Sequence, residues 1–225
     1  MYCSSLTTAS FPACTNINSS AFYFCRNLTE VNFSACTNIN SNAFRSCGSL
    51  TTVSFPACTD INDDAFCHCD SLTTVSFPSC TRIGTEAFYL CSNLTEANFP
   101  VCTSIGNWVF YSCPKLITVS FPMCTNIGTS AFTCCFSLTT VSFPACTSIK
   151  GCAFQSCYNL LSAYFMGSSI PSLAASNIFN STPIAGYTTS TNGVYGSIYV
   201  PASMLESYKT ATNWAYFADR FVGVE

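Results

Sequence analysis

Phenylalanine returns at every twenty-second position over most of the chain, and this fixed period restricts the possible folds more than any other feature. The aligned residues are Phe11, Phe33, Phe55, Phe77, Phe99, Phe121, Phe143 and Phe165. A period between about 20 and 50 residues indicates a solenoid, in which each repeat buries its apolar edge against the next copy. We therefore expect the 225 residues to form one elongated unit.

One repeat has the pattern C-x-x-L-x-x-V-x-F-P-x-C-T-x-I-x-x-x-A-F-x-x, as in residues 47–68. Within it Val53 and Phe55 alternate with polar residues, which is the side-chain period of a strand. Proline follows the phenylalanine in most copies and lacks the N–H that would continue the ladder. Each coil is therefore predicted to add one short parallel strand with Val and Phe facing inward.

A second segment of each repeat, which carries the Ala-Phe pair, is predicted to form a brief helical turn. In six copies the position before it holds a good N-cap residue. These residues are Ser19, Ser41, Asp63, Thr85, Asn107 and Thr129. Since strands stack at about 4.8 Å, eight such coils would be about 35–40 Å long.

The period divides the chain into two parts. Residues 1–165 are predicted to form a right-handed solenoid of about eight coils, since parallel crossovers are almost always right-handed. The period breaks after Phe165, so residues 166–225 are predicted to form a C-terminal closing segment that packs on the last coil. In that segment Ile198–Val200 should add the last strand, and Trp214 and Phe217 should cover the final coil.

The repeat contains the L-x-x-L-x-L-x-x-C-x-x-I core of a leucine-rich repeat, with Val and Phe in two of the Leu places. Its A-F-x-x-C-x-x-L ending resembles the repeats of BspA-like bacterial surface proteins, and residues 196–220 resemble the closing segment of that family. Members are secreted or displayed on the cell surface, and some take part in adhesion to host matrix proteins and other cells. The resemblance therefore implies an extracellular or cell-surface location and an extracellular protein or glycan ligand.

The outward positions of the predicted strands are the candidate binding residues. They are Thr8, Ser10, Glu30, Asn32, Thr52, Ser54, Thr74, Ser76, Glu96, Asn98, Thr118, Ser120, Thr140, Ser142, Ser162 and Tyr164. This polar face offers many hydroxyl groups and few of the Trp, Tyr or Arg side chains that dominate binding energies. The same residues would equally serve only to solvate a β-surface. Tyr23, Tyr89, Tyr111 and Trp108 form an alternative contact patch on the other side.

Composition and motifs exclude several functions. A net charge of −3 gives no basic footprint for nucleic acid, and no apolar run approaches the roughly 18 residues of a membrane span. We predict no enzymatic activity, no metal and no cofactor, because no catalytic motif is present. The only histidine, His68, lies in "DDAFCHCD". The free polar groups around it, Asp60, Asp64, Cys67 and Asp70, make a metal or Cys–His site a weaker alternative.

The 18 cysteines fall mainly into two columns of the repeat. One column is Cys3, Cys25, Cys47, Cys69, Cys91, Cys113, Cys135 and Cys157, and the other is Cys14, Cys36, Cys58, Cys80, Cys102, Cys124 and Cys146. We interpret them as small buried hydrophobes rather than a disulfide framework. Disulfides between neighbouring coils stay possible because like cysteines lie about 5 Å apart. Cys67, Cys134 and Cys152 lie outside both columns and should be the more accessible thiols.

Three functions fit these observations. The leading one is a non-enzymatic adhesion or binding module that contacts macromolecules through an extended solenoid face. The second is a structural spacer within a larger surface protein. The third is ice or crystal-surface binding through Thr-x-Ser rows, and it is the weakest because Glu30, Asn32, Glu96 and Asn98 interrupt those rows.

Overall fold

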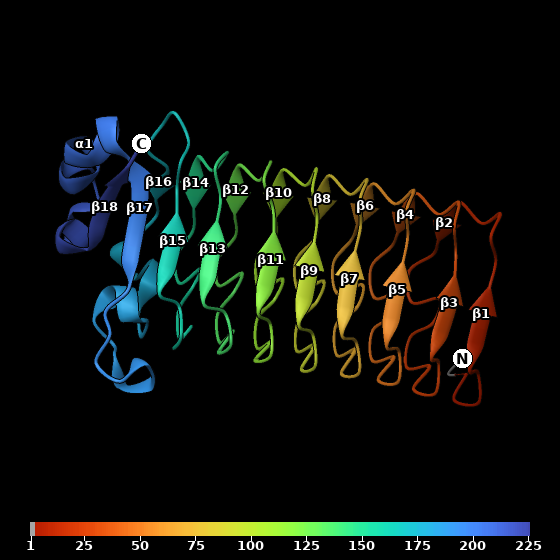
Figure 1. Cartoon of the computed structure of the whole chain (residues 1–225). Coiled ribbons are helices and arrows are strands. Elements are labelled where there is room, and N and C mark those ends of the chain that lie inside the picture. The colour runs from red at the N-terminus through yellow and green to blue at the C-terminus, as the bar shows by residue number, and fades with distance from the viewer. Residues whose placement is uncertain (1–2) are drawn as a thin grey trace.

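Two rows of short parallel strands run along an elongated, nearly straight rod in the computed structural model, which describes residues 3–225 (Figure 1). The first row contains β1 (Thr8–Ser10), β3 (Glu30–Asn32), β5 (Thr52–Ser54), β7 (Thr74–Ser76), β9 (Glu96–Asn98), β11 (Thr118–Ser120), β13 (Thr140–Ser142) and β15 (Ser162–Tyr164). It continues into β17 (Ser197–Pro201) and β18 (Phe221–Val224). The predicted solenoid with one such strand per coil is confirmed.

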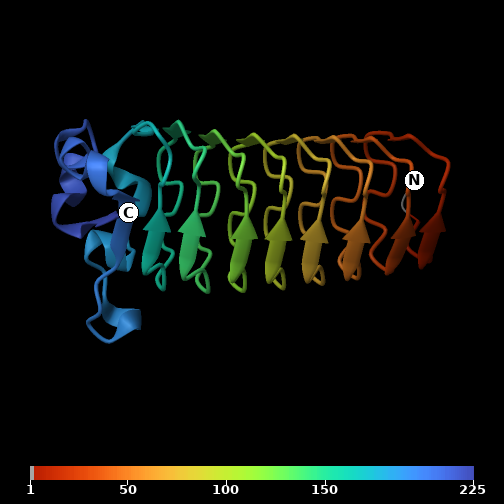
Figure 2. The ribbon, with the colours of Figure 1, turned by 45° about the horizontal axis from the view of Figure 1, so that its top comes forward.

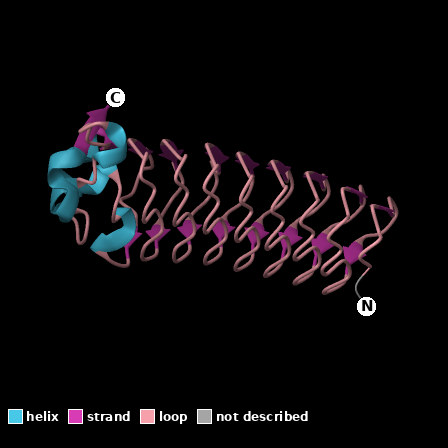
Figure 3. Cartoon of the chain, turned by 90° about the horizontal axis from the view of Figure 1, so that it is seen from below, coloured by secondary structure: helices cyan, strands magenta, loops and turns pink. Residues whose placement is uncertain are grey.

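The second row was not predicted and consists of two-residue strands. They are β2 (Asn16–Ile17), β4 (Asn38–Ile39), β6 (Asp60–Ile61), β8 (Arg82–Ile83), β10 (Ser104–Ile105), β12 (Asn126–Ile127), β14 (Ser148–Ile149) and β16 (Ser172–Leu173). These eight strands form one continuous parallel sheet (Figure 3). A ladder of threonines runs beside it, in which Thr59 Oγ1 donates to the carbonyl oxygen of Thr37 at 3.1 Å. Each coil therefore contains two strands rather than one.

The predicted helical turn around the Ala-Phe pair is wrong. Two residues of each turn, four positions apart, have left-handed φ angles, as in Asp64 (59°) and His68 (58°). A left-handed residue interrupts the i to i−4 ladder of a helix, so the N–H groups find partners on the next coil instead. The N–H of His68 donates to the carbonyl oxygen of Tyr89 at 2.8 Å. Asp63 likewise accepts from the N–H of Thr85 at 2.8 Å, so it bridges two coils instead of capping a helix.

Two columns of phenylalanine rings fill the interior. Phe77 is fully buried and stacks on Phe55 and Phe99, with ring centroids 5.7 and 5.4 Å away. Its edge contacts Phe88 of the second column, whose centroid lies 6.1 Å away. Such aromatic pairs add about 0.5–1.5 kcal/mol to the free energy of burial. The repeated Phe positions therefore hold neighbouring coils together.

The cysteine columns are buried as predicted from Cys25 onward, whereas Cys3 is exposed and Cys14 is half-buried at the first coil. All cysteines within residues 3–225 are free thiols. In the first column the thiol donates to a phenylalanine carbonyl of the preceding coil, for example Cys47 to Phe22 at 3.1 Å. Burial raises the pKa of the Cys47 thiol to about 12, so the thiol is protonated at neutral pH.

The prediction that Cys67 is accessible is wrong, because its side chain is fully buried. Its counterparts on the adjacent coils are the long side chains of Arg45 and Tyr89, and the short thiol lies sheltered between them. Cys134 and Cys152 are half-buried. They therefore remain the more accessible of the three thiols outside the columns.

The C-terminal end carries all helices of residues 3–225 (Figure 3). They are η1 (Ser176–Phe179), η2 (Pro183–Ala185), η3 (Thr189–Thr191), η4 (Ala202–Met204), α1 (Leu205–Thr210) and η5 (Ala215–Arg220). None of them has the length and hydrophobicity needed to cross a bilayer.

The stacking pattern extends beyond Phe165 with longer loops. Strand β16 pairs with β14 although Ser172 follows Ser148 by 24 residues instead of 22, and Phe179 stacks on Phe154 with centroids 5.5 Å apart. Strand β17 pairs with β15, but the last strand is β18, which pairs with β17 and was not predicted. The division into a solenoid over residues 1–165 and a closing segment over 166–225 stays a prediction, and its first two residues lie outside the described range.

Trp214 covers the end of the stack. Its ring makes an edge contact with Phe165, with centroids 5.3 Å apart, and its Nε1 donates to the carbonyl oxygen of Pro171 at 2.6 Å. Phe217 makes an edge contact with Phe179 at 5.5 Å. Both residues are buried, so aromatic rings close this end of the apolar interior.

Candidate functional site

The strand face is the outward surface of the first row of strands (Figure 2). Every candidate residue predicted on it lies in one of these strands. The inward residue of each strand is buried or half-buried, and its two neighbours point outward, as in β7 where Val75 lies between Thr74 and Ser76. Parallel register aligns equivalent residues, so Thr74 lies beside Thr52 and Ser76 beside Ser54. The outward residues therefore form two columns along the rod.

These two columns are listed here from the N-terminal end. The first is Thr8, Glu30, Thr52, Thr74, Glu96, Thr118, Thr140 and Ser162, and the second is Ser10, Asn32, Ser54, Ser76, Asn98, Ser120, Ser142 and Tyr164. Most are exposed, while Asn98, Ser162 and Tyr164 are half-buried.

The strand face carries little charge and no ion pair among the described residues. Its carboxylates, Glu30 and Glu96, lie three coils apart, which is about 14 Å at the stacking distance of strands. This separation is too large for the paired carboxylates of an acid–base mechanism such as glycoside hydrolysis. The face therefore offers dispersed hydrogen-bonding groups rather than a reactive centre.

The ladder beneath the strand face is interrupted at two places. The hydrogen-bonded sheets of this row contain β1 and β3, then β5, β7, β9 and β11, then β13, β15, β17 and β18. At the C-terminal end Tyr164 stacks on Tyr199, with ring centroids 4.4 Å apart. Sequence reasoning missed Tyr199, because it lies beyond the regular period. The face thus combines polar rows with an aromatic pair at one end.

The turn face is the surface formed by the turns at residues 18–26 and by their equivalents in later coils. The polar groups predicted to lie around His68 do not form a single cluster with it. Asp60 pairs instead with Arg82, at an O–N distance of 3.4 Å. Asp64, Cys67 and Glu86 place possible ligand atoms within 4.8 Å of one another.

This cluster is poorly suited to a metal ion. The Arg45 guanidinium already forms an ion pair with Asp64 and supplies a cation there. Burial raises the pKa of Cys67 to about 12, and metals bind the thiolate rather than the thiol. Burial and the neighbouring Asp64 carboxylate also raise the pKa of Glu86. His68 does not belong to the cluster.

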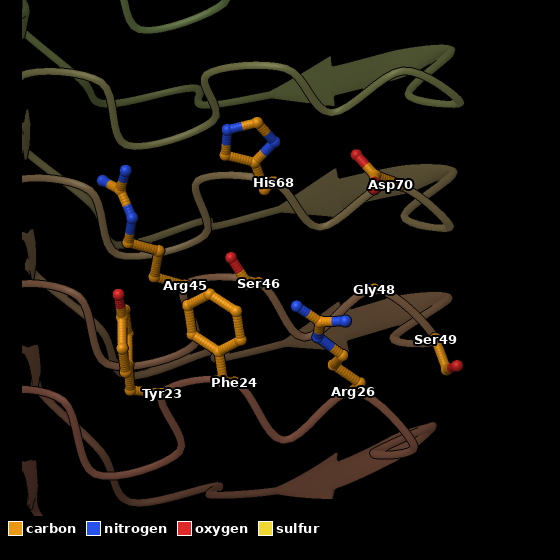
Figure 4. A pocket seen from close by; sticks show the side chains of 9 residues that line it. All are labelled: Tyr23, Phe24, Arg26, Arg45, Ser46, Gly48, Ser49, His68 and Asp70. Atoms are coloured by element: carbon orange, nitrogen blue, oxygen red, sulfur yellow. The ribbon is translucent and has the colours of Figure 1, made fainter. Parts of the chain in front are cut away.

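A hollow of about 610 Å³ opens on the turn face over the first three coils (Figure 4). We call it the turn-face hollow. The residues that define it are Phe24, Arg26, Ser46, Gly48, His68 and Asp70. No prediction from the sequence placed a pocket here.

The hollow results from small residues on the middle coil between larger ones on the flanking coils. Ser46 lies between Phe24 and His68 at equivalent positions of the repeat, and Gly48 lies between Arg26 and Asp70 (Figure 4). A Cβ atom added to Gly48 would meet no atom within 4 Å. The missing side chains on the second coil therefore leave the space open.

The predicted aromatic patch is only partly assembled. Tyr89 and Tyr111 stack with centroids 5.2 Å apart, and Trp108 is 37% exposed near them. Tyr23 lies in the earlier coils and lines the turn-face hollow. The four residues thus belong to two separate parts of the turn face.

Comparison with known families identifies the repeat. The sequence profile of the BspA type leucine rich repeat region matches residues 1–100 and 59–185, with six copies. The chain belongs to the BspA-type leucine-rich repeat family.

Solved structures of bacterial leucine-rich repeat proteins share the fold. A leucine-rich repeat protein of T. pallidum is 27% identical, with a TM-score of 0.56 over 61% of this chain and 67% of that protein. One from Eubacterium ventriosum is 18% identical, with a TM-score of 0.51 over 78% of this chain and 43% of that protein. No curated protein matches the chain.

Proposed function

We propose that this BspA-type protein is a non-enzymatic binding or adhesion module that acts outside the cell. Its partner is an extracellular protein or glycan, which it contacts across several coils of the strand face. Membership of the BspA-type family supports a binding role and a cell-surface location. A repeat array presents a long regular surface instead of one pocket, and such a surface suits contact over a large area.

The observation that carries the proposal is the alignment of outward side chains. Parallel register repeats the Thr and Ser positions from β5 to β7 without a shift. An extended partner therefore meets a polar contact at the same place on each coil. Because no single residue on the face supplies a large share of the contact, affinity should grow with the number of coils engaged.

The test is removal of whole coils. Deleting residues 92–113 removes one 22-residue unit, and deleting residues 92–135 removes two; both deletions join equivalent positions of the repeat. The full chain is first screened on a panel of immobilised matrix proteins and a glycan array. Affinity for the bound partner should fall stepwise with each coil removed. An affinity that survives both deletions unchanged would show that contact is not distributed across these coils.

A screen with no bound partner would favour the structural spacer. A thermal-hysteresis assay on the same protein tests ice binding separately. A binding module and a structural spacer are therefore told apart by the screen itself, because only a binding module has an affinity that the removal of coils can lower.

A further inference from the structure

The turn-face hollow concentrates the scarce basic groups of the chain. Only seven lysines and arginines and one histidine occur in 225 residues. Two of those arginines, Arg26 and Arg45, line this hollow together with His68 (Figure 4). The hollow is a different surface from the strand face, so its role goes beyond the proposed function.

Arg26 is the group in the hollow that is open to a ligand. Its guanidinium lies over the ring of Phe24, 4.9 Å from the centroid, which orients the planar group. It forms no ion pair with a carboxylate of residues 3–225, whereas Arg45 is paired with Asp64. A guanidinium held in this way presents a fork of donors that matches a carboxylate.

Acceptor groups line the opposite side. Asp70 is exposed, and it lies two coils from Arg26 across the gap left by Gly48. Two coils correspond to about 10 Å at the stacking distance of strands. Ser46 and Ser49 add hydroxyl groups between the two walls. A ligand in this space meets the guanidinium of Arg26, the exposed carboxylate of Asp70 and the polar side chains of the serines and His68, while the second guanidinium, that of Arg45, is paired with Asp64.

This combination selects among ligand classes. A neutral sugar leaves Arg26 without an acidic partner. A dense polyanion such as nucleic acid places a second negative charge close to Asp70, and like charges repel strongly at short range. A sugar with one carboxylate and several hydroxyls satisfies both walls, because hydroxyl groups donate to Asp70 while the carboxylate accepts from Arg26.

We propose that the turn-face hollow binds an acidic sugar unit of a glycan. The sugar carboxylate pairs with Arg26, its hydroxyl groups bond to Asp70 and the serines, and its ring lies over the floor left free by Gly48. Glycans in which a uronate alternates with a neutral sugar present such isolated carboxylates. They are therefore the expected ligands of this site.

The test uses the full chain and two oligosaccharides of equal length. One alternates glucuronate with N-acetylglucosamine, and the other contains only N-acetylglucosamine. In an NMR titration the acidic oligosaccharide should shift the amide signals of residues 24–26, 46–49 and 68–70. The neutral oligosaccharide should bind with at least tenfold lower affinity. Raised salt should weaken the acidic complex, since exposed charges are screened.

Two variants challenge the site in different ways. Arg26→Gln removes the cation and should lower affinity at least tenfold. Gly48→Leu fills the hollow and should abolish binding. This variant should still fold, because a Cβ atom at position 48 meets no other atom within 4 Å. The matched control is Lys115→Gln, which removes a cation bonded to Asn93 elsewhere on the surface and should bind as the unmodified protein does. Thermal melting verifies that each variant is folded.

Three results would overturn the proposal. They are undiminished affinity in both Arg26→Gln and Gly48→Leu, equal affinity for the neutral oligosaccharide, or tighter binding of an aspartate-rich peptide of the same charge. The deletion of residues 92–113 leaves the hollow intact and should not change the titration. Failure of the strand-face function and failure of this site are therefore distinguishable.

Discussion

The thiol of Cys69 donates a hydrogen bond to the carbonyl oxygen of Phe44, 25 residues earlier, at a distance of 3.2 Å. Cys91 makes the same bond to Phe66 at 3.2 Å. The thiol thus fills a small space in the core and also gives a second hydrogen bond to the Phe44 carbonyl oxygen, which already accepts from the N–H of Cys47 at 3.1 Å. A carbonyl oxygen has two lone pairs, so cysteine combines the packing of a small hydrophobe with a weak second donor to that oxygen.

Thiol labelling should follow burial. A thiol must be both exposed and ionised to react with an alkylating reagent. At neutral pH we therefore expect Cys3 and Cys14 to react first, followed by Cys134 and Cys152. The column cysteines from Cys25 onward should react far more slowly than they do in the unfolded chain. Cys67 should be protected with the columns. Mass spectrometry after timed labelling gives the order. Regular bridges between Cys25 and Cys47 and between Cys69 and Cys91 would contradict the interpretation of the columns as buried thiols.

Alkaline pH should destabilise the protein. Burial raises the pKa of Cys47 and Cys113 in the folded chain to about 12, against 9.0 for an unperturbed thiol. The folded state therefore holds these protons more tightly, so the stabilisation is complete below pH 9 and is lost as pH rises from 9 toward 12. Urea unfolding at pH 7, 9 and 10.5 under reducing conditions should show a falling free energy of unfolding only above pH 9.

The control for the alkaline effect is Cys113→Ala, which removes one such thiol. Its free energy of unfolding should be lower at pH 7 but should decrease less steeply above pH 9. The same slope in both proteins would mean that Cys113 does not take part in the titration.

A core substitution and a strand-face substitution three residues apart should differ greatly in their effect on the free energy of unfolding. Phe77→Ala removes a ring that contacts both phenylalanine columns and should cost about 3–5 kcal/mol of unfolding free energy. Thr74→Ala changes an exposed side chain and should cost about 0.5 kcal/mol or less. Denaturant unfolding of both variants measures the difference. Similar costs would mean that the inward and outward sides of the strands are reversed.

The first row of strands and the core were predictable because they depend on residues that recur with one period. Phe77 shows the same spacing and chemistry as its neighbours, and burial follows from the alternation around Val75. The second strand of each coil is only two residues long, as in Asn38–Ile39. A side-chain alternation cannot be recognised over two residues, so this sheet has no sequence signal of its own.

The turns were mispredicted because one residue type serves two local structures. Asp63 has the chemistry of a helix N-cap, but its carboxylate accepts from Thr85 on the next coil. The left-handed φ of bulky residues such as Leu90 and Trp108 is imposed by hydrogen bonds between coils, and their side chains do not favour it. Local propensity therefore gives the wrong answer where stacking determines the backbone.

The strand face was predictable from alternation, whereas the turn-face hollow required comparison down a column. Gly48 is unremarkable within its own repeat. It leaves a gap only because Arg26 and Asp70 occupy the same position in the neighbouring coils. Aligning the repeats and looking for small residues between large ones would have found it.

The C-terminal end should depend on Trp214 more than on any exposed ring near it. Trp214→Ala removes the edge contacts with Phe165 and Tyr208, both at 5.3 Å, and should cost about 3–5 kcal/mol. Trp214→Phe keeps a ring but leaves the carbonyl oxygen of Pro171 without its indole donor, which should cost about 1–3 kcal/mol.

Tyr216 is the matched control, because it lies two residues away and is 73% exposed. Tyr216→Ala should change the free energy of unfolding by about 0.5 kcal/mol or less. Hydrogen exchange should show which coils lose stability, since each coil contacts only its neighbours. In Trp214→Ala the amides of β15 and β17 should exchange faster, while those of β5 and β7 should keep their protection. Equal costs for Trp214→Ala and Tyr216→Ala, or uniform loss of protection along the rod, would show that Trp214 does not close the apolar interior.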